Sequence, residues 1–170
     1  ERANLTKVLD DIEKTFKKKA VKFQVPIGSG ANFKGVVDLI KMKSYSFSND
    51  QSGKTTEGEI PSDLKDETDQ YREELIEAAA ETNDELTEKY LEEGSLTEDE
   101  IKRGLKAGIN NATVIPILYG SALNNHGVSS LLDIIVEYLP SPDVRPPMKG
   151  KDDSEKEVVR QNSPDEPLSA

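Results

Sequence analysis

The sequence predicts an α/β chain with an α+β insert, in which a small antiparallel sheet and acidic helices join a strand–loop–helix unit. Two observations predict this class. The spacing of apolar residues changes along the chain between the period of a helix and the period of a strand. A mostly apolar run at residues 114–119 leads into a glycine- and serine-containing turn and then into an amphipathic stretch. The 170 residues can bury a sizeable core.

The first half of the chain predicts one helix followed by strands. The apolar residues of residues 5–16 recur on one helical face, namely Leu5, Val8, Leu9, Ile12 and Phe16. Residues 21–27 alternate and predict one strand, and residues 33–40 and 42–47 predict two more. The links between these strands are too short for helical crossovers, so we expect antiparallel pairing. A short fourth strand is predicted at residues 55–60.

The second half of the chain predicts helices around one buried strand. A long helix opens after Pro61, and a second helix at residues 84–91 ends at Gly94. Thr97 and Glu100 have the spacing of a capping box and predict the start of a third helix. The run at residues 114–119 is typical of a strand buried on both faces.

The carboxyl-terminal part of the chain predicts a helix followed by a stiff linker. Residues 127–138 are amphipathic, and four prolines between residues 140 and 147 end regular structure. The last twenty residues are polar, with one possible strand at residues 157–160.

The charge of the chain is concentrated in one stretch. The net charge is −11, and sixteen of the 33 acidic residues lie between Asp63 and Glu100. An acidic face repels phosphate backbones and attracts basic proteins, so we expect little direct contact with nucleic acid. A weaker basic patch is interpreted as a solvated face rather than a phosphate contact; its members are Lys14, Lys17, Lys18, Lys19, Lys22, Lys41 and Lys43.

Several kinds of chemistry find little support in the sequence. The chain has no cysteine, which excludes disulfide scaffolds and thiolate metal sites. Its one histidine, His126, stands in a polar loop, where we expect it to be solvated. No apolar run approaches the length of a membrane span and no signal peptide opens the chain, so a cytoplasmic protein without membrane contact is expected. The chain opens on Glu1, and we expect it to be a piece of a larger protein.

The most informative segment is the turn that follows residues 114–119. Gly120, Ser121 and Ala122 are small, and small residues after a parallel strand let a flat ligand approach the backbone. A backbone N–H at this point could donate to the keto oxygen of guanine. Adenine has an amino group there and would leave the donor unpaired, at a cost of roughly 1–3 kcal/mol. Taken alone, the pattern is more typical of a plain tight turn.

Several segments together resemble the elongation factor G family of translational GTPases. They keep the order of that family over about residues 1–145. They are Val25-Pro26-Ile27-Gly28, Phe33 to Leu39, Glu77 to Glu81, Glu85 to Glu92, Leu96 to Ile101, Gly120-Ser121-Ala122-Leu123 and Asp133 to Pro142. The resemblance implies that residues 1–20 hold the helix after an Asn-Lys-x-Asp motif, 21–110 the inserted G-prime subdomain, 111–140 the end of a P-loop GTPase domain, and 141–170 a proline-rich linker and the start of a barrel domain.

The resemblance also implies site residues and a division of labour. Ser121 and Ala122 would face guanine, with Ala122 as the N–H donor and Leu123 as a packing residue. The P-loop, the switch regions and the Asn-Lys-x-Asp motif are absent from these 170 residues. We therefore expect GTP or GDP with magnesium only in an intact parent GTPase, and neither catalysis nor a cofactor nor a metal in this chain alone.

The resemblance further implies partners. Glu73, Glu77 and Glu81 recur every four residues, with Asp84 beside them, and would form a docking surface for the ribosomal stalk protein on the ribosome. The plainer interpretation is a solvated helix face. A stand-alone acidic α+β interaction module, a small carboxylate enzyme, and a ribosomal protection or recycling paralogue stay open as alternatives. An apolar sheet edge without its usual neighbours would favour self-association.

Overall fold

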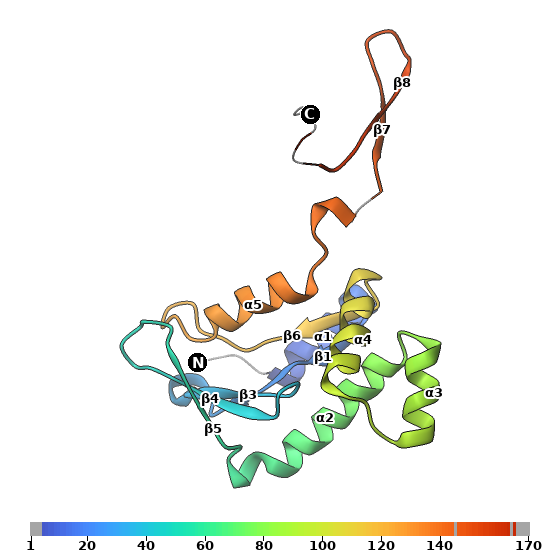
Figure 1. The fold of residues 1–170 in the computed structure, drawn as a ribbon. Helices are drawn as coiled ribbons and strands as arrows, with labels where there is room; N and C mark the ends of the chain where they lie inside the picture. The colour runs from blue at the N-terminus through green and yellow to red at the C-terminus, as the bar shows by residue number, and fades with distance from the viewer. Residues whose placement is uncertain (1–4, 145, 164, 166–170) are drawn as a thin grey trace. The chain divides into compact units, whose positions relative to one another are not determined.

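The chain adopts an α+β fold in two compact units. The computed structural model describes residues 5–144, 146–163 and 165. One unit is Glu1–Tyr138 and the other is Leu139–Ala170. Figure 1 shows the first unit as strands beside a group of helices, and the second as a hairpin.

The first unit contains two sheets. One is a parallel pair of β1 (Lys19–Lys22) and β6 (Val114–Ile117). The other is antiparallel and follows chain order; its strands are β2 (Gln24–Ile27), β3 (Gly35–Asp38), β4 (Lys43–Phe47) and β5 (Thr55–Gly58). The antiparallel pairing that the short links predict is confirmed, from Gln24 opposite Asp38 to Phe47 opposite Thr55.

The single strand predicted at residues 21–27 is wrong, because the chain changes sheets at Phe23. The Phe23 N–H donates to the Ile117 carbonyl at 3.0 Å, on the side of the parallel pair. The Phe23 carbonyl accepts from the Leu39 N–H at 2.9 Å, on the side of the antiparallel sheet. Val21, Phe23 and Val25 are all buried, so the alternation of apolar residues runs unbroken while the hydrogen-bond partner changes.

Five helices accompany the strands in the described residues. They are α1 (Leu5–Phe16), α2 (Lys65–Ala80), α3 (Asp84–Glu93), α4 (Glu98–Asn110) and α5 (Val128–Tyr138). The predicted capping box is confirmed, because the Thr97 hydroxyl accepts from the Glu100 N–H and the Glu100 carboxylate accepts from the Thr97 N–H at 2.8 Å. Gly94 ends α3 in a left-handed conformation, as its place in the sequence predicts.

The core lies where α2, α4 and the sheets meet. Leu75 from α2 and Leu105 from α4 are fully buried in it. Arg72 fastens α2 to the turn between β3 and β4, since its Nη1 donates to the carbonyl oxygens of Leu39 and of Ile40 (2.9 Å for the second). Burial lowers the pKa of this guanidinium. The Tyr138 ring packs edge-on at 5.4 Å from the Phe23 ring and joins α5 to the same core, and burial raises the pKa of its phenol.

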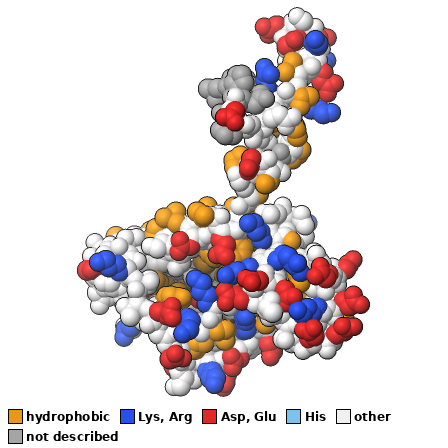
Figure 2. Space-filling view, viewed as in Figure 1, with side chains coloured by type: hydrophobic (Ala, Val, Ile, Leu, Met, Phe, Trp, Pro, Cys, Tyr) orange, Lys and Arg blue, Asp and Glu red, His pale blue; other side chains and the backbone are white. Residues whose placement is uncertain are grey.

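Two helices keep apolar side chains at the surface of the first unit. Phe16 of α1 is 61% exposed, and Val136 of α5 is 84% exposed. In Figure 2 apolar side chains follow α5. The prediction that residues 114–119 are buried on both faces is wrong, because in β6 only Val114 is buried. Ile117 of β6 lines an open apolar groove together with residues of α1 and α5, so the side chains of this strand stay partly exposed.

The second unit is a short hairpin after the proline-rich segment. Strand β7 (Met148–Lys151) pairs antiparallel with β8 (Glu157–Arg160). The strand predicted at residues 157–160 is confirmed, whereas its partner was not predicted, because residues 148–151 have no apolar alternation. Among the residues that the structure describes, no helix has the length and apolar character to cross a membrane.

Candidate functional site

The segment between β6 and α5 forms a small closed loop. The Ser121 N–H donates to the His126 carbonyl at 2.9 Å, and the His126 N–H donates to the Ser121 carbonyl at the same distance. Within the loop the Asn125 N–H donates to the Ala122 carbonyl at 3.2 Å. Residues 122–125 are therefore held as a turn just beyond the carboxyl end of β6, which is the edge where open α/β sheets bind ligands.

Two glycines allow the neck of this loop to close. A Cβ on Gly127, whose φ is +74°, would lie 2.6 Å from the Tyr119 carbonyl oxygen. A Cβ on Gly120 would lie 2.9 Å from the His126 carbonyl oxygen. Any larger residue would force the two sides of the neck apart, so both glycines are needed for the shape of the loop.

The predicted guanine-contacting residues occupy the exposed part of this loop. Ser121 is half-buried at its base, Ala122 is exposed, and Leu123 is 88% exposed. The Ala122 N–H has no hydrogen-bond partner among the described residues. A free, preorganised N–H at the end of a parallel strand can donate to a carbonyl oxygen of a ligand. Leu123 packs against little of the described chain.

The expectation that His126 is solvated is wrong. Its side chain is only 8% exposed, and its ring stacks on Phe47 with centroids 4.8 Å apart and an angle of 15°. The Phe33 ring lies 6.3 Å away. The Nδ1 atom of His126 is buried without a hydrogen-bond partner in the described part of the chain. The sequence could not predict the contact between His126 and Phe47, because the two residues lie far apart in the chain.

The link between β4 and β5 supports the loop from the side. The Asn125 Nδ2 donates to the Gln51 carbonyl at 3.0 Å. Asp50 orders the link, since its carboxylate accepts from the Ser48 hydroxyl at 2.6 Å and from the Ser52 N–H at 3.0 Å. These hydrogen bonds lower the pKa of Asp50 to about 2. The antiparallel sheet thus contacts the very turn that carries Ala122.

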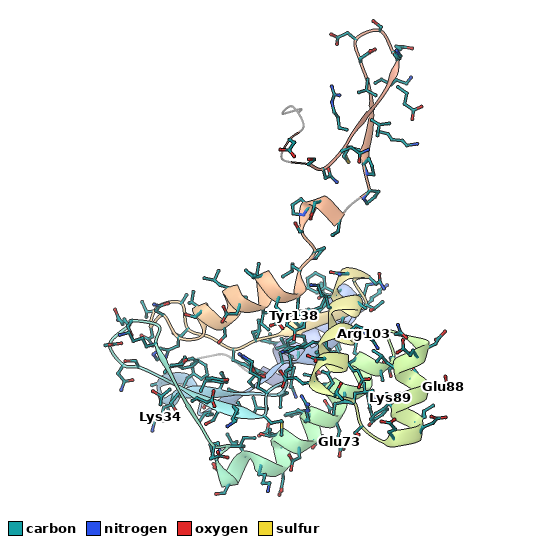
Figure 3. All side chains as sticks on the ribbon, in the orientation of Figure 1. Lys34, Glu73, Glu88, Lys89, Arg103 and Tyr138 are labelled. Carbon is teal, nitrogen blue, oxygen red and sulfur yellow. The ribbon has the colours of Figure 1, made fainter. Side chains whose placement is uncertain are left out.

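The predicted acidic docking surface lies along α2 and the start of α3. Glu73 and Glu77 are exposed on α2, Glu81 follows the last residue of that helix, and Asp84 begins α3. Figure 3 shows Glu73 on α2 and Glu88 on α3. Glu81 forms an ion pair with Lys19 of β1, at 2.9 Å, that the sequence did not predict. We call Glu73, Glu77, Glu81 and Asp84 the acidic stripe.

Lysines of β1 border the acidic stripe. The Lys22 Nζ lies 3.2 Å from the centroid of the Tyr71 ring, a cation–π contact between β1 and α2. Lys19 and Lys22 line a small pocket of about 180 Å³ together with Glu74 and Glu77. Glu81 of the acidic stripe is thus paired with Lys19, whereas Glu73, Glu77 and Asp84 form no ion pair with the described residues.

A second charged network lies between α3 and α4. The Lys89 Nζ is 2.7 Å from Glu100 Oε1 and 3.7 Å from Glu93 Oε2. The hydrogen bond from Lys89 and those from Thr97 lower the pKa of Glu100 to about 2. Figure 2 shows acidic side chains gathered over α3. Within the described residues, no group of three histidine or carboxylate side chains could hold a metal ion.

Comparisons with known proteins support the fold. No model of a known protein family matches the chain. The chain is similar to the crystal structure of a protein from Thermus thermophilus, with a TM-score of 0.72 and 26% sequence identity. The similarity covers 85% of this chain and 22% of that protein, so the chain spans about a fifth of the length of the solved structure that it matches.

Proposed function

We propose that the chain is part of an elongation factor G-like translational GTPase that acts on the ribosome in the cytoplasm. It contributes the guanine-contacting loop at the end of the GTPase domain and an inserted subdomain that docks the ribosomal stalk. The parent protein hydrolyses GTP, and this chain by itself turns over none. A ribosomal protection or recycling protein of the same family would have the same parts.

The observation that carries this proposal is the free main-chain N–H of Ala122. It lies in an exposed turn at the carboxyl end of a parallel strand, and the hydrogen bonds of Ser121 and His126 hold that turn closed. A donor in a fixed position can recognise the keto oxygen at C6 of guanine and discriminate against a purine that lacks it.

The unpartnered apolar surfaces of the first unit also support the proposal. A groove of about 350 Å³ is lined almost wholly by apolar side chains, among them Ile12 of α1, Ile117 of β6 and Leu131 of α5. The parallel sheet of β1 and β6 has only two strands in the described residues. Parallel sheets are normally covered on both faces, whereas this one borders an open apolar groove. The remaining strands of a GTPase domain would pair with the open edge of β6 and cover this groove.

The test measures nucleotide binding to the protein encoded by the full reading frame that contains this chain. We expect it to bind GDP more tightly than the diphosphate of 2-aminopurine riboside, which lacks the keto oxygen. The preference should be about tenfold or more, because an unpaired donor costs roughly 1–3 kcal/mol. Ala122→Pro removes the N–H and should abolish this preference. Equal affinity of the unmodified protein for both nucleotides would overturn the guanine assignment.

Two controls separate the loop from the fold. Ser129→Ala alters an exposed side chain at the start of α5, outside the proposed guanine contact, and should leave the preference unchanged. The 170-residue chain alone should bind neither nucleotide in calorimetry, because the phosphate-binding motifs are absent from it. Micromolar binding of GTP to the isolated chain would contradict its interpretation as one part of a GTPase.

The docking role of the acidic stripe has its own test. Glu73→Lys with Glu77→Lys should slow association with the carboxyl-terminal domain of the stalk protein at low salt, because opposite charges speed diffusional encounters. Glu88→Lys with Glu92→Lys changes the same charge on exposed residues of α3 and is the matched control. If both pairs of substitutions slow association equally, the stripe has no special role.

The second candidate function is that of a stand-alone acidic α+β interaction module unrelated to GTPases. The exposed carboxylates over α3 are compatible with such a module. It predicts stalk-independent binding of basic proteins and no guanine preference in any longer form of the protein. The nucleotide measurement therefore decides between the two functions.

A further inference from the structure

A polar pocket lies between the antiparallel sheet and the loop that carries Ala122. Its volume is about 570 Å³, which is within the range of small-molecule sites. Its hydrogen-bonding side chains come from the segments around β3 and β4 and from the loop; they are Lys34, Ser46, Asn49, Gln51, Ser121 and Asn124. Ala122 and Leu123, which the proposed guanine contact uses, are not among the residues that line it.

The charge of this pocket is opposite to that of the chain. The chain carries 33 acidic residues, yet no carboxylate lines the pocket. Lys34 forms no ion pair within the described residues, so its ammonium group is available to a ligand. Figure 3 shows Lys34 beside the antiparallel sheet. The nearby carboxylate of Asp50 already accepts from Ser48 and Ser52.

Three ring side chains line the pocket beside its polar groups. His126 lines the pocket beside Phe33 and Phe47, and its buried Nδ1 has no partner among the described residues. The rings of Phe33, Phe47 and His126 contact one another and give the pocket an apolar part.

We propose that this pocket binds a small sugar phosphate. The single lysine suits one phosphate monoester, and the amides and hydroxyls of the wall suit the hydroxyl groups of a sugar. A nucleic-acid surface would need several cations along a backbone, and the pocket has one. This site shares Ser121 with the proposed guanine contact but uses neither Ala122 nor Leu123, and its test does not depend on the GTPase assignment.

The test is a titration of the 170-residue chain followed by amide chemical shifts. The probes are ribose 5-phosphate, ribose, inorganic phosphate and a short single-stranded RNA. We expect ribose 5-phosphate to shift amides around Lys34, Gln51 and Asn124 and to bind more tightly than ribose or phosphate. Lys34→Gln should weaken that binding about tenfold, because it removes a charge-assisted hydrogen bond.

Two further variants keep the test decisive. Lys54→Gln removes the same charge from a residue that does not line the pocket and should leave the affinity unchanged. Asn124→Ala, in the exposed turn, should weaken binding without altering the sheet. The proposal fails if ribose 5-phosphate does not bind at millimolar concentration, if both lysine variants act alike, or if RNA binds through these residues and ribose 5-phosphate does not.

Discussion

Replacing Gly104 by alanine tests how closely α2 and α4 approach. A Cβ on Gly104 would lie 2.9 Å from the carbonyl carbon of Ala79 and 3.0 Å from its Cβ, with the carbonyl oxygen nearer still. These are the backbone atoms and the Cβ of Ala79 in α2, and no side-chain rotation can move them out of the way. The two helices would have to move apart by several tenths of an ångström or more.

The expected change in the free energy of unfolding is opposite in sign to the change that helix propensity alone predicts. Glycine to alanine inside a helix normally stabilises by about 1 kcal/mol, whereas overpacking a core costs about 1–3 kcal/mol. The clash is with backbone, so we take the upper end of the overpacking cost, about 3 kcal/mol, and subtract the propensity gain of about 1 kcal/mol. Gly104→Ala should therefore lower the free energy of unfolding by about 2 kcal/mol. The separation would also stretch the 3.0 Å hydrogen bond from the Thr82 hydroxyl to the Gly104 carbonyl.

The assay is urea unfolding followed by far-ultraviolet circular dichroism. Lys106→Gly, on the exposed face of α4, calibrates propensity alone and should cost about 1 kcal/mol. If Gly104→Ala were more stable than the unmodified chain by about that amount, the close approach of α2 and α4 would be refuted.

Two further predictions concern acid stability and self-association. The pKa of Glu100 is about 2, against 4.5 for a free carboxyl, so the stabilisation from its carboxylate is present above pH 4.5 and is lost as the pH falls toward 2. Glu100→Gln should therefore be less stable than the unmodified chain at pH 7 but similar to it at pH 2 in thermal melts. Lys89→Met should raise the pKa of Glu100 in a chemical-shift titration. The exposed apolar face of α5, where Leu132 and Val136 are 56% and 84% exposed, should make the unmodified chain self-associate. Leu132→Lys with Val136→Lys places charge on this face and should convert the self-associated chain to monomer in sedimentation experiments. An unmodified chain that is already monomeric would contradict the prediction.

The loop that carries Ala122 shows how far sequence reasoning reaches. The change from apolar residues to Gly120-Ser121-Ala122 predicted a turn after a strand, and the turn is there. The sequence could not show that Asn125 is hydrogen-bonded to Gln51, because nothing local links residues so far apart. The pocket beside the loop was missed for the same reason. Its lining residues, both polar and aromatic, come from three separate segments, and only folding brings them together.

Local interactions explain what the sequence by itself determined. The capping box of Thr97 and Glu100, the helix end at Gly94 and the antiparallel order of the short strands all depend on residues near one another in the chain, and each was predicted from spacing alone. The concentration of negative charge between Asp63 and Glu100 also follows directly from the sequence.

Only the tertiary structure decided where the chain changes sheets at Phe23, that His126 is buried on Phe47, and that Lys19 pairs with Glu81. Each of these depends on contacts between segments that are far apart in the chain. Composition and periodicity describe which side chains avoid water, but not which of the many available partners each one meets.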